Sequence, residues 1–294
     1  IEIGFLQDNI SPSLNKTISN NIDIFDRILS KIPDKKFKTA VMINSGKFNI
    51  NFLKHKNETL IDEIRLMFKK QDLKEAVDNA VKIKEKGYSL SLNPVSVTAY
   101  KNDDLKNLIK SANKIQPEII YIVDTYGLMD EQETIDVFNL FNNELNENIK
   151  IGYHTHNNLQ LAYANSIKII NNSLKRNIVV DGSLYGMGKR AGNTNTELIA
   201  AYLNKNYNHN YDINKINDII ESTIIPMHKK YEWGYSISHY LAAINKCHSE
   251  YVTYLKNEKN IPYSEINKIL KNIPENKKLT FDENCINMIF SNKV

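Results

Sequence analysis

Short β-rich runs alternate with longer amphipathic stretches along the first two thirds of the chain, and this alternation constrains the fold more than any other feature. The runs recur every ~25–30 residues, as expected of βα units around a parallel sheet. They lie at residues 1–5, 39–43, 63–68, 88–92, 119–123, 151–156 and 178–181. No GxGxxG sequence follows the first run, so the pattern favours a TIM (β/α)8 barrel over an open dinucleotide-binding sheet. These seven runs predict an α/β barrel that lacks its first strand in this chain.

The pattern changes after Asn206, beyond which no strand candidate remains. Residues 214–224, 231–254, 263–270 and 282–290 have helical character. Pro226, Pro262 and Pro274 stand near the ends of these stretches, where proline is tolerated because it removes a backbone donor. We therefore predict a catalytic barrel over residues 1–206 and a C-terminal helical region over residues 207–294.

Length and composition exclude several classes of protein. The 294 residues are 41% hydrophobic and 24% charged, as in soluble globular proteins, and no apolar run approaches the ~20 residues of a membrane span. The net charge of +4 comes from lysines scattered among acids, which does not favour nucleic acid as a partner. Cys247 and Cys285 lack a CxxC spacing and are expected to be reduced thiols. The chain is expected to be cytoplasmic, with no membrane and no nucleic-acid partner.

Two helix starts share one capping signature. Asp130 is followed three residues later by Glu133, and Thr194 by Glu197. In such a capping box the two side chains satisfy backbone N–H groups that the first helical turn leaves free. We expect helices to begin at both places, each just after a strand.

Two histidines, His154 and His156, stand at the end of the sixth run. Strand alternation places both on one face, roughly 6.5–7 Å apart at ~3.3 Å per residue. Two imidazoles so placed can share one divalent metal, and barrel enzymes carry their active sites at this end of the strands. Two polar histidines in the mouth of a barrel, without a metal, would show the same spacing. Residues 154–156 by themselves therefore leave open whether the histidines bind a metal.

Two further segments at strand ends accompany the histidines. They are VDTYG at 123–127 and GMGKRAGNTNTE at 186–197, on either side of HTHNNLQLAYANS at 154–166. Together the three resemble the metal-dependent lyase and synthase superfamily of (β/α) barrels that includes hydroxymethylglutaryl-CoA lyase, isopropylmalate synthase and 4-hydroxy-2-oxovalerate aldolase. The resemblance covers about residues 1–203. The C-terminal helices, with Trp233-Gly234-Tyr235-Ser236, look more like those of the hydroxy-oxovalerate aldolases.

The resemblance implies a metal site and a substrate site. His154 and His156 match the histidine pair that binds a divalent metal, either Mn, Mg, Co or Zn. Asn193 matches an asparagine that some members add as a ligand, and it could otherwise serve only the turn into a helix. Thr125 matches a hydroxyl position that contacts pyruvate, while Asp124 either binds substrate or orients its neighbours.

The resemblance also implies groups for proton transfer and for holding an arginine. Glu2 matches a glutamate that helps hold an active-site arginine, with a place in an ordinary polar layer as the alternative. In the family the first strand carries that arginine, followed by a metal-binding aspartate. This chain begins inside a strand-like run without a methionine, so we expect that strand upstream of Ile1. Tyr240, or else Tyr235, matches a tyrosine associated with proton transfer, and core packing is the alternative for both.

The chemistry that the resemblance implies is cleavage or formation of a carbon–carbon bond next to a carbonyl. The first hypothesis is an aldolase acting on a 4-hydroxy-2-oxo acid through a pyruvate enolate. A Claisen-type synthase that joins an acyl-CoA to a 2-oxo acid is the second, favoured by the GKRAGN loop at 188–193. A non-catalytic barrel is the third, favoured by the missing strand. The expected partner is a small-molecule 2-oxo acid. Association with further copies of the chain, as a homo-oligomer, or with a partner enzyme is also possible.

Overall fold

The computed structural model describes residues 1–14, 16–173 and 176–291, and its strands form one eight-stranded sheet within these ranges. The strands follow one another in the order β2-β1-β3-β4-β5-β6-β7-β8. Their bounds are β1 Glu2–Leu6, β2 Ile18–Ser19, β3 Ala40–Asn44, β4 Glu63–Phe68, β5 Ser89–Pro94, β6 Ile119–Asp124, β7 Lys150–Thr155 and β8 Ile178–Val180. The strands run parallel, and β4 to β8 are each followed by a helix, so the predicted α/β barrel class is confirmed.

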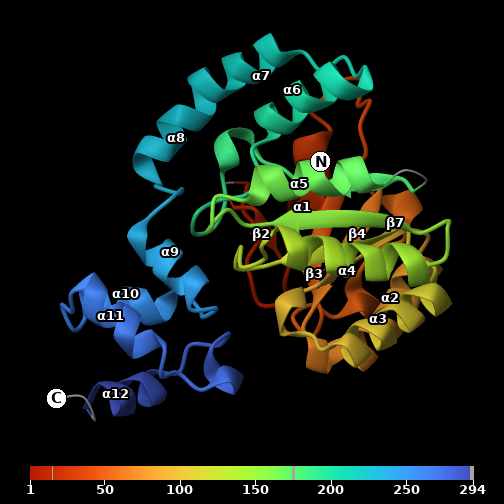
Figure 1. Cartoon of the computed structure of the whole chain (residues 1–294). Coiled ribbons are helices and arrows are strands. Elements are labelled where there is room, and N and C mark those ends of the chain that lie inside the picture. Colours follow the sequence, from red (N-terminus) through yellow and green to blue (C-terminus); the bar gives the residue numbers. More distant parts are fainter. Residues whose placement is uncertain (15, 174–175, 292–294) are drawn as a thin grey trace. The chain divides into compact units, whose positions relative to one another are not determined.

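Helices follow the strands and then continue alone to the C-terminal end (Figure 1). Those between or directly after strands are α1 Asp23–Leu29, α2 Leu73–Glu85, α3 Asn102–Ile115, α4 Glu131–Glu144, α5 Ala162–Asn172 and α6 Thr196–Tyr207. The later ones are α7 Ile213–Ile219, α8 Ile225–Lys230, α9 Ile237–Ile244, α10 Glu250–Asn257, α11 Tyr263–Leu270 and α12 Glu283–Ser291. A π-helical turn, Ile220–Ile224, joins α7 to α8. None of the helices in the described ranges is both long and apolar enough to span a bilayer.

Internal contacts divide the described residues into two compact units. The sheet unit comprises residues 1–123, 138–152 and 176–179, apart from residue 15. The loop-and-tail unit comprises residues 124–137, 153–173 and 180–291, and so contains the segments after β6, β7 and β8 together with α6 to α12. The predicted boundary after Asn206 stays a prediction.

The eighth strand of the sheet is one that the sequence pattern missed. The two-residue β2 pairs in parallel with Phe5 and Leu6 of β1 and follows β1 along the chain. Gly4 makes this pairing possible, because a Cβ on Gly4 would lie only 2.3 Å from the carbonyl oxygen of Thr17. Two residues are too few to give a periodic signal, whereas the seven predicted strands all appear within a few residues of their expected positions.

The prediction of one long helix over residues 231–254 is wrong, because two short helices, α9 and α10, occupy that stretch. Ser236 begins α9, with its hydroxyl accepting a hydrogen bond from the His239 N–H. After Ile244 the chain turns through Lys246, which has a left-handed φ of 51°, and the N–H of His248 donates to a carbonyl outside the helix. The apolar residues Ile237, Leu241 and Ile244, which recur at helical spacing, therefore belong to α9 alone.

One predicted capping box is confirmed and the other is wrong. At the start of α4, Glu133 N–H donates to Asp130 and Asp130 N–H donates to the Glu133 carboxylate. At the start of α6, Glu197 instead accepts from the backbone N–H of Tyr185, 3.0 Å away, and from the side chain of Asn195. Glu197 thus stabilises the segment before the helix rather than the helix start itself.

Helices α9 to α12 share a core of their own in the loop-and-tail unit (Figure 1). Its members are Leu241, Ala242, Cys247, Tyr251, Val252, Leu255, Ile266, Ile269, Leu270, Ile273 and Ile286. Burying each large aliphatic side chain contributes about 1.5–3 kcal/mol. Cys247 and Cys285 are both buried as free thiols, in keeping with the reading of the sequence.

Replacing Gly4 by Ala should lower the free energy of unfolding by about 2–3 kcal/mol, because the new methyl group meets backbone and cannot be relieved by a rotamer change. The Phe5 and Gln7 amides, which donate to Thr17 and Ser19, should exchange hydrogen faster as β2 separates. Urea unfolding and hydrogen exchange measure the two effects. The control is Gly87→Ala, whose Cβ has room and which should cost only about 1 kcal/mol for its left-handed backbone. Equal losses in the two variants would contradict this account of β2.

Candidate metal and substrate site

His154 and His156 lie together at the end of β7. His154 is in the strand and His156 follows it directly. Their ring centroids are 5.5 Å apart and the planes are inclined by 77°. Two imidazoles that bind one metal at about 2.0–2.1 Å keep their centroids about 4.5–5.5 Å apart. The observed separation is within reach of a shared ion.

The second nitrogen of each ring is held by an acceptor. His154 Nδ1 lies 2.9 Å from the Asp181 carboxylate, and His156 Nδ1 lies 3.1 Å from the carbonyl oxygen of Lys189. Because these oxygens can only accept, each Nδ1 carries a proton, and the neutral ring has its lone pair at Nε2. Metal-binding histidines are usually oriented in this way.

Burial keeps His156 uncharged. Burial, followed by the charges of His154 and Arg190, lowers the pKa of His156 to about 3. Taking an imidazolium out of water is costly, and a neighbouring cation adds to that cost. His156 is therefore neutral at physiological pH, the form that can donate a lone pair to a metal.

Asn193 adds an oxygen beside the histidines. Its backbone forms an antiparallel bridge with His156, and its side-chain NH2 donates to the Met187 carbonyl oxygen at 3.0 Å. The remaining Oδ1 is buried and has no hydrogen-bond partner among the described residues. Such an orphaned acceptor is costly unless a ligand satisfies it.

These residues fit a divalent metal as ligands. They offer two imidazole Nε2 atoms and one amide oxygen, a donor set that suits borderline and hard divalent ions. In the part of the chain that the structure describes, no group of three or more His, Cys, Asp and Glu side chains is arranged to hold a metal. The residues of this chain that would hold such an ion are therefore His154, His156 and Asn193.

Asp181 is a residue of this site to which the sequence analysis gave no role. It comes directly after β8 and holds His154 in place through its carboxylate. The available signal was its position, because Asp181, like Asp124, stands where a strand passes into a loop of the family motif.

Asp124 lies at the end of β6 with only 1% of its surface exposed. Its two carboxylate oxygens accept hydrogen bonds from the backbone N–H groups of Leu128 and Met129, at 2.9 and 3.0 Å. Burial raises the pKa of Asp124, although these two hydrogen bonds act to lower it. This arrangement shapes the loop after β6, on which the half-buried Thr125 stands.

Gly127 lets the loop after β6 approach the histidine segment. It has a φ of +59°, and a Cβ there would lie 2.4 Å from the carbonyl oxygen of His156 and 2.7 Å from the amide nitrogen of Asn158. The backbone N–H of His156 also donates to the Asp124 carbonyl oxygen at 3.2 Å. The loops after β6 and β7 are thus joined backbone to backbone.

Arg190 connects the loop after β8 to the C-terminal helices. Its guanidinium lies 4.7 Å from the centre of the Tyr126 ring and donates to the Ser249 hydroxyl at 3.1 Å, beside His248. Its carbonyl oxygen accepts from the N–H of Gly234. Burial lowers its pKa without removing the charge of a guanidinium. The segment that carries Asn193 is in this way fixed to α10.

The two candidate tyrosines are both at the surface of the loop-and-tail unit. Tyr240 lies on α9 with 38% of its surface exposed, and Tyr235 precedes α9 with 56% exposed. Neither hydroxyl forms a hydrogen bond with His154 or His156 in the described part of the chain. Next to Tyr240, His239 has a buried Nδ1 without a partner, and burial together with Arg190 lowers its pKa. No motif in the sequence marks His239.

Glu2 has an arginine partner within this chain, on β4, while an arginine upstream of Ile1 stays a prediction. Its Oε2 lies 3.0 Å from Nη1 of Arg65, which is 7% exposed. The guanidinium also lies 4.3 Å from the centre of the Tyr121 ring. In the same sheet unit Ser91 donates to Glu63. The signal for Arg65 was a cation that stands among the apolar residues of β4.

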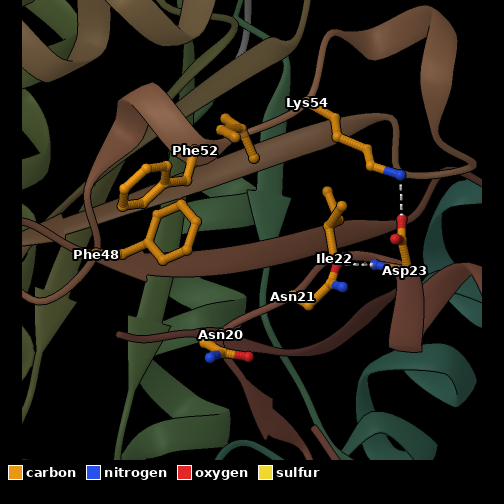
Figure 2. A pocket seen from close by; sticks show the side chains of 8 residues that line it. Asn20, Asn21, Ile22, Asp23, Phe48, Phe52 and Lys54 are labelled. Carbon is orange, nitrogen blue, oxygen red and sulfur yellow. Dashed lines mark hydrogen bonds and ion pairs between the residues drawn. The ribbon is translucent and has the colours of Figure 1, made fainter. Parts of the chain in front are cut away.

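A cavity of about 360 Å³ lies in the sheet unit between residues 20–23 and 48–54 (Figure 2). Phe48 and Phe52 form one wall, and Phe52 is 74% exposed. Lys54 and Asp23 form an ion pair on the other side. The two charged residues that line this cavity are thus paired with each other.

A family model matches this architecture and these loops. The model of the HMGL-like family matches residues 15–223. The chain belongs to the HMGL-like family. This match confirms the resemblance based on the three segments at strand ends.

Relatives of known name are similar over a shorter stretch. The 4-hydroxy-2-oxovalerate aldolase of Pseudoalteromonas translucida (strain TAC 125) is 37% identical over 109 residues, which are 37% of this chain and 31% of that protein. The protein of the same name from Pseudomonas putida is 35% identical over 109 residues, with the same shares covered. The match thus spans about a third of the length of these relatives.

Solved structures share the fold of this HMGL-like chain. The N-terminal domain of a candidate aldolase from Bacteroides vulgatus has a TM-score of 0.71 and 26% identity, covering 87% of this chain and 86% of that one. The carboxyl transferase domain of Rhizobium etli pyruvate carboxylase has a TM-score of 0.67 at 14% identity, over 92% of this chain and 51% of that one. The latter similarity concerns the fold alone.

Replacing Asp181 by Asn should weaken binding of Mn²⁺ about 10- to 100-fold, because the amide no longer fixes the tautomer and orientation of His154. Calorimetric titration of the full-length protein with Mn²⁺ measures the affinity, and thermal melting checks the fold. Asp218→Asn, at an exposed position of α7, is the matched control. Unchanged Mn²⁺ affinity in the Asp181 variant would remove Asp181 from the site.

Proposed function

We propose that the protein is a divalent-metal-dependent carbon–carbon lyase, an aldolase that cleaves or forms a 4-hydroxy-2-oxo acid through a pyruvate enolate. The observation that carries this proposal is the donor set at the end of β7: two histidines whose Nδ1 atoms are engaged, and the orphaned Oδ1 of Asn193. Membership of the HMGL-like family and the relatives named 4-hydroxy-2-oxovalerate aldolase support it.

His154, His156 and Asn193 would hold the metal. When bound, a divalent ion supplies Lewis acidity that stabilises negative charge developing on the oxygen of a 2-oxo acid, typically by several kcal/mol. Mn, Mg, Co and Zn all suit two imidazoles with oxygen ligands. Asp181 and the Lys189 carbonyl keep the two rings in the tautomer that this role requires.

The other candidate residues bind the substrate, orient neighbouring groups or transfer a proton. Thr125, half-buried after β6, donates its hydroxyl to the substrate, and Asp124 acts through the loop that it fixes rather than by touching substrate. Tyr240 moves the proton of the substrate's 4-hydroxyl as the C3–C4 bond breaks, with Tyr235 as the alternative. Glu2 orients Arg65 inside the sheet unit. A small 2-oxo acid is the partner; a homo-oligomer or partner enzyme stays a prediction.

Replacing both His154 and His156 by Ala should abolish stoichiometric metal binding and turnover of 4-hydroxy-2-oxopentanoate in the full-length protein, because two of the three proposed ligands are lost. Metal content is measured by emission spectrometry and turnover by pyruvate release. His209→Ala, at an exposed position, is the control. Wild-type metal content and activity in the double variant would refute the assignment, and turnover that requires an acyl-CoA would favour the synthase instead.

Tyr240→Phe removes one hydroxyl and almost no volume. If this hydroxyl transfers the proton, kcat should fall roughly 10²-fold or more while folding stability stays nearly unchanged. Tyr235→Phe serves as the comparison, because it deletes the same group five residues earlier. Wild-type kinetics for Tyr240→Phe with a loss for Tyr235→Phe would assign the role to Tyr235.

A further inference from the structure

A second cavity, of about 240 Å³, lies within the loop-and-tail unit. Its walls come from the loops after β7 and β8 and from the segment that leads from α8 to α9. The lining residues are Asn157, Gln160, Tyr185, Gly186, Ala191, Asn195, His228, Trp233, Gly234 and Tyr235. The proposed metal ligands His154, His156 and Asn193 do not line this cavity.

Several of the residues that line the cavity are aromatic. Trp233 Nε1 donates to the Tyr185 carbonyl oxygen at 2.9 Å, and His228 Nε2 donates to the Trp233 carbonyl oxygen at 2.9 Å. The His228 ring packs edge-on against Trp233, with 4.5 Å between centroids. Tyr185 remains 41% exposed although it is tied into this cluster. The rings are thus held in place and still offer surface to a ligand.

Three carboxamides supply the polar groups of the cavity. Each uses one end inside the protein: Gln160 donates to the Asn157 carbonyl oxygen, Asn157 Oδ1 accepts from the N–H of Ala162, and Asn195 donates to Glu197. Within the described residues the other ends have no hydrogen-bond partner, which leaves Oε1 of Gln160 and Oδ1 of Asn195 as acceptors and the NH2 of Asn157 as a donor. The cavity therefore presents both donors and acceptors, already oriented.

The backbone around the cavity is strained. Gln160 has a φ of 60°, Tyr185 of 56° and Gly186 of 63°. A non-glycine residue in this region costs of order 1–3 kcal/mol and persists where its surroundings hold it, often at binding sites. Glu197 does so here, because its carboxylate accepts from the Tyr185 N–H and from Asn195.

The lining indicates an uncharged ligand that carries hydroxyl groups. Among the described residues that line the cavity there is no Asp, Glu, Lys or Arg. Hydroxyl groups both donate and accept, so they match a mixed set of carboxamide atoms, while the C–H faces of a polyol pack on aromatic rings. The volume equals that of about eight waters, enough for a short hydroxylated chain.

The cavity and the metal ligands belong to the same loops. Asn157 follows His156 directly, and its backbone N–H donates to the Gly192 carbonyl oxygen at 2.9 Å. The N–H of Asn193 donates to the Gly186 carbonyl oxygen at 3.0 Å. A Cβ on Gly192 would lie 3.4 Å from the Trp233 ring. Groups that touch the cavity are therefore joined to the proposed ligands by the backbone.

We propose that this cavity binds the uncharged, polyhydroxylated end of the substrate, so that the 4-hydroxy-2-oxo acid is a sugar-derived acid; this inference rests on the proposed lyase function. In the cleavage direction the C3–C4 bond breaks, its electron pair passes to C3 and the proton of the 4-hydroxyl leaves. Protonation of C3 then gives pyruvate, and C4 becomes the carbonyl carbon of a hydroxylated aldehyde. No oxidant or reductant is needed.

Trp233 makes binding directly measurable, because it is the only tryptophan in the sequence. The full-length protein with Mn²⁺ is titrated with 4,5,6-trihydroxy-2-oxohexanoate and, separately, with 4-hydroxy-2-oxopentanoate, which lacks the hydroxylated end. The trihydroxy acid should change Trp233 fluorescence at concentrations at least roughly 10-fold lower, as expected for two or more added hydrogen bonds. Equal responses to the two acids, or a response to adenosine as strong as that to the trihydroxy acid, would overturn the proposal.

Gln160→Asn tests the polar side of the cavity, since it withdraws the carboxamide by one methylene and keeps a residue that tolerates a left-handed backbone. KM for the trihydroxy acid should rise about 3- to 10-fold, and KM for 4-hydroxy-2-oxopentanoate should not change. Gln116→Asn is the matched control, because Gln116 also has a left-handed φ, of 55°, and does not line the cavity.

The outcomes separate the cavity from the lyase. If the trihydroxy acid changes Trp233 fluorescence and Gln160→Asn weakens that response while neither acid is cleaved, the cavity assignment is supported and the lyase fails. If both acids are cleaved with equal KM and Gln160→Asn changes neither, the lyase stands and the cavity assignment is overturned. Thermal melting of both glutamine variants confirms that they fold.

Discussion

The backbone bridge between His156 and Asn193 is the constraint on which the candidate site depends. It brings the end of β7 and the loop after β8 together, although 36 residues separate them in sequence. Neighbouring backbone bonds, from Asn157 N–H to Gly192 and from Asn193 N–H to Gly186, extend it on both sides. Because these contacts join backbone to backbone, the imidazoles and the orphaned amide oxygen are positioned before any ligand arrives, which reduces the reorganisation that binding would require.

The sequence predicts the parts of this structure that depend on period and spacing. Alternation within a strand suffices to place His154 and His156 on one face, and the recurrence of β-rich runs suffices for the barrel class. The same approach misses β2, because its two residues are too few to give a periodic signal. It also misses the ion pair of Glu2 with Arg65, since strands distant in sequence supply the partners. The ion pair could not be predicted because it depends on a contact between segments that lie far apart in the chain.

The C-terminal segment shows how a correct periodicity can still give a wrong element. The apolar residues Ile237, Leu241 and Ile244 do recur at helical spacing, yet the helix ends after Ile244, and α10 starts anew at Glu250. The turn between them brings Ser249 and His248 to Arg190, which a continuous helix could not do while also donating the His248 N–H outside the helix. The hydrogen bonds to Arg190 and to the Lys278 carbonyl oxygen thus outweigh the small gain in free energy that a continuous helix would bring.

Asp124 and Asp181 show why equal sequence signals can lead to different chemistry. Asp124 is the last residue of β6 and Asp181 directly follows β8, so position alone gives both the same prospect of meeting substrate or metal. Their surroundings separate them. Asp124 is fully buried and its oxygens are used by two backbone N–H groups, so a ligand could reach it only by breaking the loop that it shapes. Asp181 is partly exposed and gives one oxygen to His154, so it would act on the proposed metal site through that ring. Burial and hydrogen-bond partners, which only the folded chain defines, therefore assign one carboxylate to the loop and the other to the site.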